Sequence, residues 1–322
     1  MRGGTSMGLF AGTSARNLGW GRTLAYAGRA ILQARFGGGH YSSVASHTER
    51  WRVFASWART QAGIRDLRAI PPELLVQYAD HLKAEGRAVS TIQNRLSTVN
   101  VILDYAREGH WEPVSPRALS GAARSAVRTQ PPRALDAGRV EAARTALQQA
   151  GLHRAAAVLG LARTFGLRSE EAAKADLDRL AKEAARLGRI NILDGTKGGR
   201  TVPRWVAVTP AGQQALQAAL AARPPGSVNL LAPTESYKGW RQGELRAGRA
   251  LLQAQGLPGY HDARAAYACE RYRELTGHPA PAVTGGRRTA ERDTDRTARA
   301  IIARELGHGR VDIAAAYVGS AR

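Results

Sequence analysis

Side chains suited to phosphate chemistry gather towards the C-terminal end of the chain. His261 and Arg264 are three positions apart, so on a helix both would project from one face. His308 follows a Leu-Gly pair, which is typical of a helix end and would place the imidazole in a turn. Tyr317 stands nine positions after His308. The whole chain is strongly basic, with a net charge of +21. In such a chain, these four side chains indicate phosphate chemistry on a nucleic acid.

Two further cations and a carboxylate stand upstream. Arg168 lies in a Gly-Leu-Arg turn before a predicted helix, and its planar fork of donors suits a phosphate oxygen. Glu171 follows in the first turn of that helix, where a carboxylate interacts well with the helix dipole. Lys197 stands at the tip of a predicted hairpin, and its ammonium could protonate a departing alkoxide.

Each of these residues also has a simpler explanation. Arg168 and Glu171 could form an ordinary surface ion pair, and Lys197 could be an exposed turn lysine. Tyr317 could pack in a core, and a histidine is more often a structural hydrogen-bonding group than a catalyst. The segment 195–199 lacks the spacing of a nucleotide phosphate loop, and H-E-x-x-H, the zinc-hydrolase pattern, is absent. We therefore expect no metal site.

Composition sets the class of protein. A chain of 322 residues with 43% hydrophobic content can form two domains with proper cores. The balance of 47 Lys and Arg against 26 Asp and Glu gives a net charge of +21, which attracts polyanions and releases their counterions. A single cysteine, Cys269, excludes an internal disulfide and favours the reducing cytoplasm. No apolar run approaches the length of a membrane span.

The N-terminal part predicts a basic arm followed by a helical domain. Residues 1–40 contain five arginines and no acid, so we expect a flexible arm that lies along DNA. Residues 41–112 are helical in pattern, with amphipathic helices over 43–60 and from Pro72, and a third with Ser90 as its N-cap. The polar face of the third helix offers candidates for base contacts, namely Gln93, Asn94 and Arg95.

A basic linker and a second domain follow. Residues 113–135 contain four prolines, four arginines and no acid, which is typical of a linker. The domain 136–322 begins with a helix capped by Asp136, and Ser169 is the predicted cap of a later helix. Two alternating or β-branched runs, 189–193 and 202–209, stand on either side of residues 194–200 and predict a hairpin. We therefore expect a mainly α fold with a small β-hairpin or sheet, an α+β arrangement.

The order of these motifs resembles the tyrosine recombinase, or phage integrase, family. An arginine, a hairpin lysine, H-x-x-R, L-G-H and a tyrosine nine positions later follow one another as in that family. The resemblance covers 136–322 as a catalytic domain and 41–112 as a helical, SAM-like core-binding domain. Between Arg264 and His308 lie more positions than usual, which indicates an insertion at about 277–298. Five residues follow Tyr317, fewer than the segment that many members exchange between protomers.

The resemblance implies a role for each motif residue. Tyr317 would attack a DNA phosphodiester to form a 3′-phosphotyrosyl link and a free 5′-hydroxyl. Arg168, Arg264 and His308 would bind the nonbridging oxygens. Lys197 would be the general acid, His261 a proton acceptor or donor, and Glu171 an orienter of the arginine. No metal, nucleotide or other cofactor is required, because the covalent link conserves the energy of the broken bond.

The predicted function is therefore a site-specific DNA recombinase or integrase of a mobile element. Its partner would be double-stranded DNA, on which a homo-oligomer, from dimer to tetramer, would assemble in the cytoplasm. Two alternatives stay open: a topoisomerase IB-like DNA-relaxing enzyme, and a non-catalytic accessory protein of the same fold. The presence of every expected catalytic residue argues against the accessory protein, since a decayed site should have lost at least one.

Overall fold

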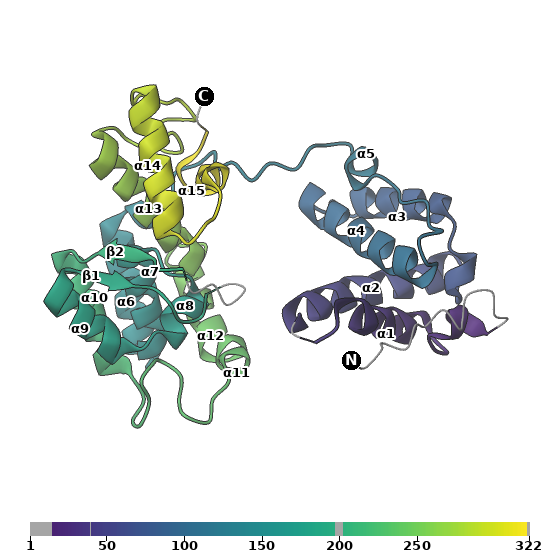
Figure 1. Cartoon of the computed structure of the whole chain (residues 1–322), viewed down its shortest axis with the longest axis horizontal. Helices are drawn as coiled ribbons and strands as arrows, with labels where there is room; N and C mark the ends of the chain where they lie inside the picture. The colour runs from purple at the N-terminus through teal and green to yellow at the C-terminus, as the bar shows by residue number, and fades with distance from the viewer. Residues whose placement is uncertain (1–14, 39, 197–201, 321–322) are drawn as a thin grey trace. The chain divides into compact units, whose positions relative to one another are not determined.

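The computed structural model describes residues 15–38, 40–196 and 202–320. It divides into two compact units, Met1–Ser125 and Ala126–Arg322, each with its own hydrophobic core. The described residues are mainly helical, with one small two-stranded sheet (Figure 1). The predicted fold class, mainly α with a small sheet, is confirmed. No helix among these residues is long and apolar enough to cross a membrane.

The first unit is a helical bundle. Helices α1, α2 and α4 pack on one another, and α3 and α5 pack on α4. Its elements in chain order are η2 (Arg16–Gly19), α1 (Leu24–Phe36), α2 (Tyr41–Gln61), η3 (Leu67–Ala69), α3 (Pro72–Ala84), α4 (Val89–Ala106) and α5 (Pro116–Ser120). Trp51 and Phe54 of α2 are fully buried against this core, as the amphipathic pattern of 43–60 predicts.

Residues 15–38, the described part of the predicted flexible arm, form the helices η2 and α1. The prediction of a flexible arm is therefore wrong for these residues. Helix α1 buries Ile31 and Leu32 completely. The Trp51 indole donates a hydrogen bond to the Leu24 carbonyl, which ties α1 to α2. The arginines of this segment stand on the exposed face, and their charge concealed an ordinary amphipathic helix. Residues 1–14 lie outside the described chain.

Two predicted helix starts are also corrected. Helix α4 begins at Val89 with Ala88 at the N-cap, so Ser90 is the second residue of the helix rather than its cap. Helix α8 has Arg168 at its N-cap, and Ser169 is its first helical residue. Asp136 caps α6 as predicted, because its side chain accepts a hydrogen bond from the Arg139 backbone N–H.

The second unit surrounds helix α7, which packs against both α10 and α13. Its elements up to the sheet are η4 (Arg133–Leu135), α6 (Ala137–Gln149), α7 (His153–Phe165), α8 (Ser169–Lys174), α9 (Leu177–Leu187), β1 (Arg189–Asn191) and β2 (Trp205–Ala207). The later elements are α10 (Pro210–Ala222), α11 (Tyr237–Gln242), α12 (Glu244–Ala254), α13 (Tyr260–Thr276), α14 (Arg292–Glu305), η5 (Val311–Ala314) and α15 (Ala315–Val318).

The predicted hairpin is present as an antiparallel pair. Strands β1 and β2 align with Ile190 opposite Val206, and both residues are buried. The strands, of three residues each, are shorter than the runs 189–193 and 202–209 that predicted them. Residues 197–201 of the connection, which include Lys197, lie outside the described chain.

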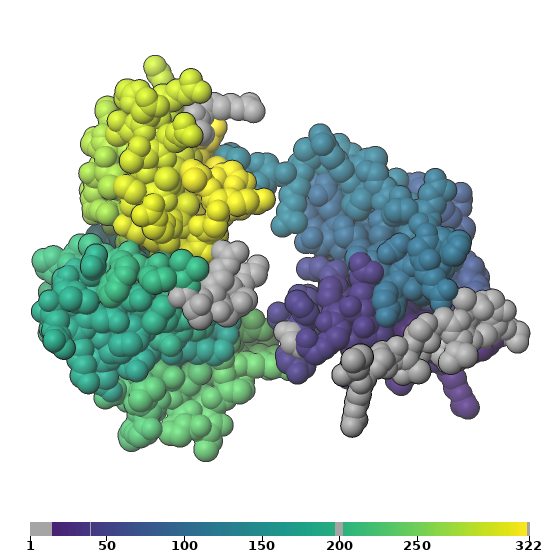
Figure 2. All heavy atoms as spheres, in the orientation of Figure 1, coloured from purple at the N-terminus to yellow at the C-terminus, as the bar shows by residue number. Residues whose placement is uncertain are grey.

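The C-terminal elements occupy one end of the second unit, where the yellow segment packs beside α13 (Figures 1 and 2). The segment between α13 and α14, which is part of the predicted insertion, contacts the end of α15. Its Ala282 backbone N–H donates to the Val318 carbonyl at 2.8 Å, and Arg299 of α14 donates to the Gly319 carbonyl at 2.9 Å. Helix α15 is thus anchored from two sides.

The predicted linker 113–135 contains two short helices, α5 and η4, and the boundary between the units falls inside it. Residues 121–127 between these helices are exposed. The Arg128 backbone N–H donates to the Ala315 carbonyl at 2.9 Å, so the end of the linker contacts the segment that carries α15.

Candidate active site

Glu171 is the buried centre of the candidate site. Its Oε2 accepts the Arg168 backbone N–H at 2.7 Å, which caps α8, and its Oε1 accepts Nη1 of Arg168 at 2.6 Å. Arg204, which lies just before β2, donates to the two carboxylate oxygens at 2.8 and 2.9 Å. Nη1 of Arg264 lies 3.4 Å from Oε2. One carboxylate therefore contacts three guanidinium groups.

These contacts leave an excess of positive charge. Glu171 and Arg264 are fully buried, and Arg204 is 4% exposed. Burial by itself would raise the pKa of the Glu171 carboxyl, but the hydrogen bonds and charge of Arg204, with the charges of Arg264 and Arg168, hold that pKa at about 2. Three cations around one permanent anion form a site suited to a further anion.

Arg264 of α13 is fixed by backbone carbonyls. Its guanidinium donates to the Gly166 carbonyl and, at 2.6 Å, to the Leu306 carbonyl. Its Nε donates to the Tyr317 hydroxyl at 3.3 Å. Burial lowers the pKa of Arg264 to about 10, so the group stays protonated at neutral pH. The α7–α8 turn and the end of α14 thus hold a charged group beside Tyr317.

His308 stands in the turn that ends α14. Gly307 has a φ of 67° and donates to the Arg304 carbonyl, while the His308 N–H donates to the Ala303 carbonyl. This pair of bonds is the Schellman arrangement that the Leu-Gly signal predicts. A Cβ at Gly307 would lie 2.5 Å from Nη1 of Arg204, so this turn also packs on the arginine that binds Glu171.

The contacts of His308 indicate which ring nitrogen carries the proton. Its Nε2 lies 3.5 Å from Nη2 of Arg168 and 3.5 Å from Nη2 of Arg264. Guanidinium groups only donate, so Nε2 serves as the acceptor and the proton of the neutral ring belongs on Nδ1. The Tyr317 hydroxyl lies 3.1 Å from the same Nε2 and can donate to it.

Burial and positive surroundings keep His308 neutral at pH 7. Burial, followed by the charges of Arg264, Arg168 and Arg204, lowers the pKa of His308 to about 4. At neutral pH the ring is therefore an unprotonated acceptor, held beside a phenol.

Tyr317 of α15 is 4% exposed, with its hydroxyl between two candidate partners. The hydroxyl can accept from Nε of Arg264 and donate to Nε2 of His308. The Arg264 guanidinium carbon also lies 5.4 Å from the centre of the phenol ring. The tyrosine therefore packs in the core, as its simpler explanation predicts, and at the same time presents its oxygen to the cationic cluster.

His261 is the second imidazole beside Tyr317. It stands in the first turn of α13, and its ring centre lies 5.4 Å from that of Tyr317. The packing around the ring, followed by the positive charges of Arg264 and Arg128, lowers the pKa of His261, although the residue as a whole stays exposed to solvent. His308, rather than His261, is the imidazole that hydrogen-bonds the phenol.

The structure brings five of the six predicted catalytic residues together with Glu171. Lys197 lies outside the described residues. Gly195, two positions before it, has a φ of 65°, and a Cβ there would lie 2.6 Å from the Glu170 carbonyl oxygen. The described end of the hairpin connection thus packs on the first turn of α8, which carries Glu171. Within the described chain, no group of three or more His, Cys, Asp or Glu residues could hold a metal.

The predicted base-contacting residues lie in the first unit and are half-buried. Gln93 donates to the Ser120 hydroxyl and the Ala122 carbonyl, each at 2.9 Å, so its amide already binds the region of α5. Asn94 accepts from Nη1 of Arg124 at 3.3 Å. These contacts tie the third predicted helix to the linker.

Arg204 is the residue that sequence reasoning missed. It lies just before β2, and its partner Glu171 is 33 positions away in sequence. The chain contains 47 Lys and Arg residues, so one more arginine gives no signal by itself. Its place in a predicted strand shows only that an arginine buried there would need a carboxylate, and does not say which one.

The comparisons with known proteins agree with this geometry. The family model described as integrase matches residues 122–270. That match spans most of the second unit, including Arg168, Glu171, Arg204, His261 and Arg264. Over these residues the second unit is similar to the integrase family. No curated protein sequence matches the chain significantly.

Two solved integrase structures share the fold over most of the chain. One is a lambda integrase dimer bound to a COC′ core site, with 15% identity, a TM-score of 0.57, and coverage of 90% of this chain and 74% of that one. Another is the Tn1549 transposon integrase in complex with transposon right end DNA, with 11% identity, a TM-score of 0.59, and coverage of 91% and 93%. These matches show the fold that the resemblance to tyrosine recombinases implies.

Proposed function

We propose that the chain is a site-specific DNA recombinase that cleaves and rejoins DNA through a covalent bond to Tyr317. One observation carries this proposal: the Tyr317 hydroxyl lies between a buried, charged Arg264 and an unprotonated nitrogen of His308. A phenol is a weak nucleophile at its ordinary pKa, and a cation on one side with a proton acceptor on the other is what its activation requires.

A DNA phosphate fits between the same side chains. The contacts from Nη2 of Arg168 and of Arg264 to His308 are both 3.5 Å long, at the limit of hydrogen bonding. A nonbridging phosphate oxygen can accept from the same two guanidinium groups, in shorter, charge-assisted hydrogen bonds. The negative charge of the phosphate would also offset the positive charges that lower the pKa of His308, which makes the imidazole a better base when DNA is bound.

The reaction conserves bonds and protons. The hydroxyl proton of Tyr317 passes to Nε2 of His308, and the phenolate oxygen bonds the phosphorus. The bond from phosphorus to the 5′ oxygen breaks, and that oxygen takes a proton from Lys197. A 5′-hydroxyl then attacks the 3′-phosphotyrosyl link in reverse, so no cofactor supplies energy. His261, whose ring is near that of Tyr317, would assist one of these transfers.

Glu171 and Arg204 have a positioning role in this proposal. The Glu171 carboxylate contacts both Arg168 and Arg264 and so fixes their guanidinium groups beside each other. Arg204 neutralises that carboxylate and packs on Gly307, in the turn before His308. For Lys197, the support is the contact of Gly195 with the first turn of α8, beside Glu171. Its role as general acid otherwise rests on the resemblance.

The proposed substrate is double-stranded DNA at the ends of a mobile element. Both similar integrase structures are DNA complexes, and one is a dimer. The net charge of +21 gives a field that attracts such a polyanion. We propose that residues 41–112 form the core-binding domain, with Gln93, Asn94 and Arg95 near the DNA, and that dimers and tetramers assemble on the recombining sites in the cytoplasm.

The test is covalent trapping on a pool of nicked duplexes that carry candidate attachment sites. Wild-type protein should form a protein–DNA adduct that survives denaturant, and Tyr317→Phe should form none. Tyr267→Phe and Tyr272→Phe are matched controls, because burial raises the pKa of both phenols and their hydroxyls donate to Glu305 and Asp295. Both should retain the adduct.

An adduct that persists in Tyr317→Phe, or that maps to Tyr267 or Tyr272, would overturn the assignment of the nucleophile. DNA binding without any adduct would favour an accessory protein. Relaxation of supercoiled DNA by an adduct-forming protein that never joins two duplexes would favour a topoisomerase.

A further inference from the structure

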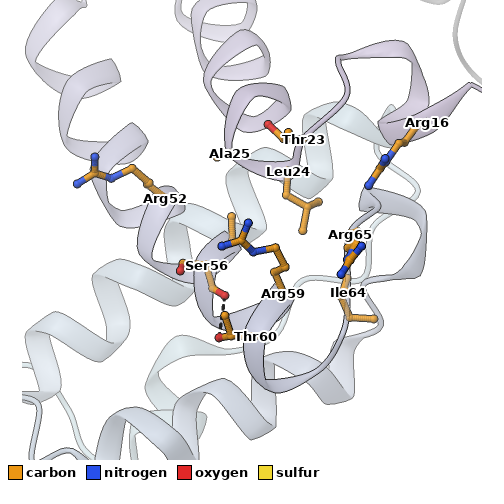
Figure 3. A pocket seen from close by; sticks show the side chains of 11 residues that line it. Arg16, Thr23, Leu24, Ala25, Arg52, Ser56, Arg59, Thr60, Ile64 and Arg65 are labelled. Atoms are coloured by element: carbon orange, nitrogen blue, oxygen red, sulfur yellow. Dashed lines mark hydrogen bonds between the residues drawn. The ribbon is translucent and has the colours of Figure 1, made fainter.

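A hollow bordered by arginines lies in the first unit (Figure 3), whereas the candidate active site belongs to the second unit. Its volume is about 670 Å³, and it lies between η2, the start of α1 and the C-terminal half of α2. No acidic residue lines it. We call it the arginine hollow, after the four arginines that border it: Arg16, Arg52, Arg59 and Arg65.

Three of these four arginines have no acidic partner within the described part of the chain. Arg52 pairs with Glu49 at 3.1 Å, whereas Arg16, Arg59 and Arg65 form no ion pair with a described residue. In the close view, the side chains of Arg16 and Arg65 extend towards each other across one side of the hollow, and Arg59 extends into it from α2 (Figure 3). Cations gathered in this way repel one another, and an anion between them would remove that repulsion.

The remaining lining residues also suit an anion. Helix α1 begins at Leu24, and Thr23, Leu24 and Ala25 line the hollow, so the positive end of the helix dipole adds to the arginine charge. Ser56 contributes a hydroxyl group, whereas the Thr60 hydroxyl already donates to the Ser56 carbonyl at 3.0 Å. No aromatic ring is among the lining residues, so the hollow offers no surface on which a base could stack. It therefore matches phosphate groups rather than nucleosides.

We propose that the arginine hollow binds phosphates of a DNA backbone, at a place separate from the polar face of α4. The proposal rests on the proposed function, which makes DNA the partner of this chain. No residue of α4 lines the hollow, so the contact would be additional to Gln93, Asn94 and Arg95. The bordering arginines are exposed, which suits an extended row of phosphates better than one enclosed ion. Such contacts hold DNA without reading its sequence.

The experiment measures DNA affinity against salt for the full chain carrying Arg59→Gln and Arg65→Gln. The matched control carries Arg29→Gln and Arg87→Gln, which removes the same charge from exposed arginines of the first unit that do not line the hollow. The probe is a duplex of about forty base pairs of unrelated sequence, titrated between about 50 and 200 mM salt. The slope of log affinity against log salt should decrease by roughly two in the hollow variant and by less than about one in the control.

Equal slopes in the two variants would overturn the proposal, because only net charge would then matter. Inorganic phosphate is the second probe. If it raises the melting temperature of the wild type and not of the hollow variant, while both variants keep the wild-type DNA slope, the ligand is a free phosphate and the DNA assignment is wrong.

The Tyr317 adduct assay separates this proposal from the proposed function. The hollow variant keeps every residue of the candidate active site, so it should still form the adduct at saturating DNA. Adduct formation together with equal salt slopes would therefore reject the hollow alone. Absence of an adduct in the wild type would reject the proposed function and leave the salt comparison as an independent test.

Discussion

At the scale of single residues, the candidate site depends on one carboxylate that orders three guanidinium groups. Glu171 is fully buried, and it is charged because Arg168, Arg204 and Arg264 surround it. A buried charge without a partner is strongly unfavourable, so each member of this group stabilises the charged form of the others. The same group leaves two guanidinium edges facing His308 and Tyr317, and the chemistry therefore depends on contacts that are also structural.

Arg204→Ala should affect cleavage more than DNA binding. It removes both hydrogen bonds that Arg204 donates to Glu171, and a broken buried pair of this kind typically lowers the free energy of unfolding by about 3 kcal/mol. The adduct should form at least about tenfold more slowly, because Arg168 and Arg264 lose their fixed place. DNA affinity should change far less. It is measured by comparing Tyr317→Phe with the Tyr317→Phe, Arg204→Ala double variant, because neither protein forms the adduct.

The matched control is Arg163→Ala, which breaks an ion pair with Glu270 elsewhere in the second unit. It should lower stability without slowing adduct formation in the folded protein. If Arg163→Ala and Arg204→Ala slow cleavage equally, Arg204 has only a structural role. Arg204→Lys should rescue little, since an ammonium cannot make the two parallel hydrogen bonds.

His308 should make stability depend on pH in the mildly acidic range. Its pKa is about 4 in the folded protein and has the ordinary value of 6.5 in the unfolded chain. Between these values the unfolded state binds a proton that the folded state does not, so stability falls as pH falls from 6.5 towards 4. Urea midpoints at pH 7.5 and pH 5 should therefore differ more for the wild type than for His308→Gln. Equal differences would mean that His308 titrates normally in the folded state.

At the scale of elements, the sequence predicts what depends on short-range patterns. The amphipathic stripe of α2, the Asp136 cap of α6 and the glycine turn after α14 are set by neighbours within a few positions, and each is present. Ser90 and Ser169 are not N-caps. Ala88 holds that position in α4, and Arg168 holds it in α8, where the Glu171 carboxylate accepts the Arg168 N–H. Helix α1 was hidden by its exposed arginines. The pairing of Arg204 with Glu171 depends on tertiary structure, and no local pattern records it.

Gly307→Ala should be more harmful than Gly277→Ala, although both glycines follow a helix. Their φ angles are 67° and 73°, so each alanine should lose about 1 kcal/mol of stability through backbone strain. At Gly277 a Cβ would meet nothing within 4 Å, whereas at Gly307 it would lie 2.5 Å from Nη1 of Arg204. Thermal unfolding should rank the two variants in this order, and only Gly307→Ala should slow adduct formation. Similar effects of both would show that the contact with Arg204 is unimportant.

At the scale of the whole molecule, the chain consists of two units with separate cores and an exposed basic connection. Each core is complete without the other, so the connection can follow a bound ligand rather than the protein. Four arginines and no acid stand in residues 113–135, a composition that suits contact with a polyanion. The sequence predicts its location from composition alone, but not the helices α5 and η4 inside it.

Limited proteolysis can test whether the connection contacts DNA. The bond between Arg124 and Ser125 lies at the boundary of the units, in the exposed segment 121–127 that forms no helix or strand. Trypsin should cleave there early, and Arg124→Gln should remove that cut. With Tyr317→Phe protein saturated with duplex DNA, cleavage of this bond should slow by roughly tenfold, because the phosphates would cover the arginines. Hydrolysis of a small peptide in the same mixture checks that DNA does not inhibit trypsin itself. Cleavage at an unchanged rate would show that the connection stays exposed on the complex, and that the two units bind DNA without it.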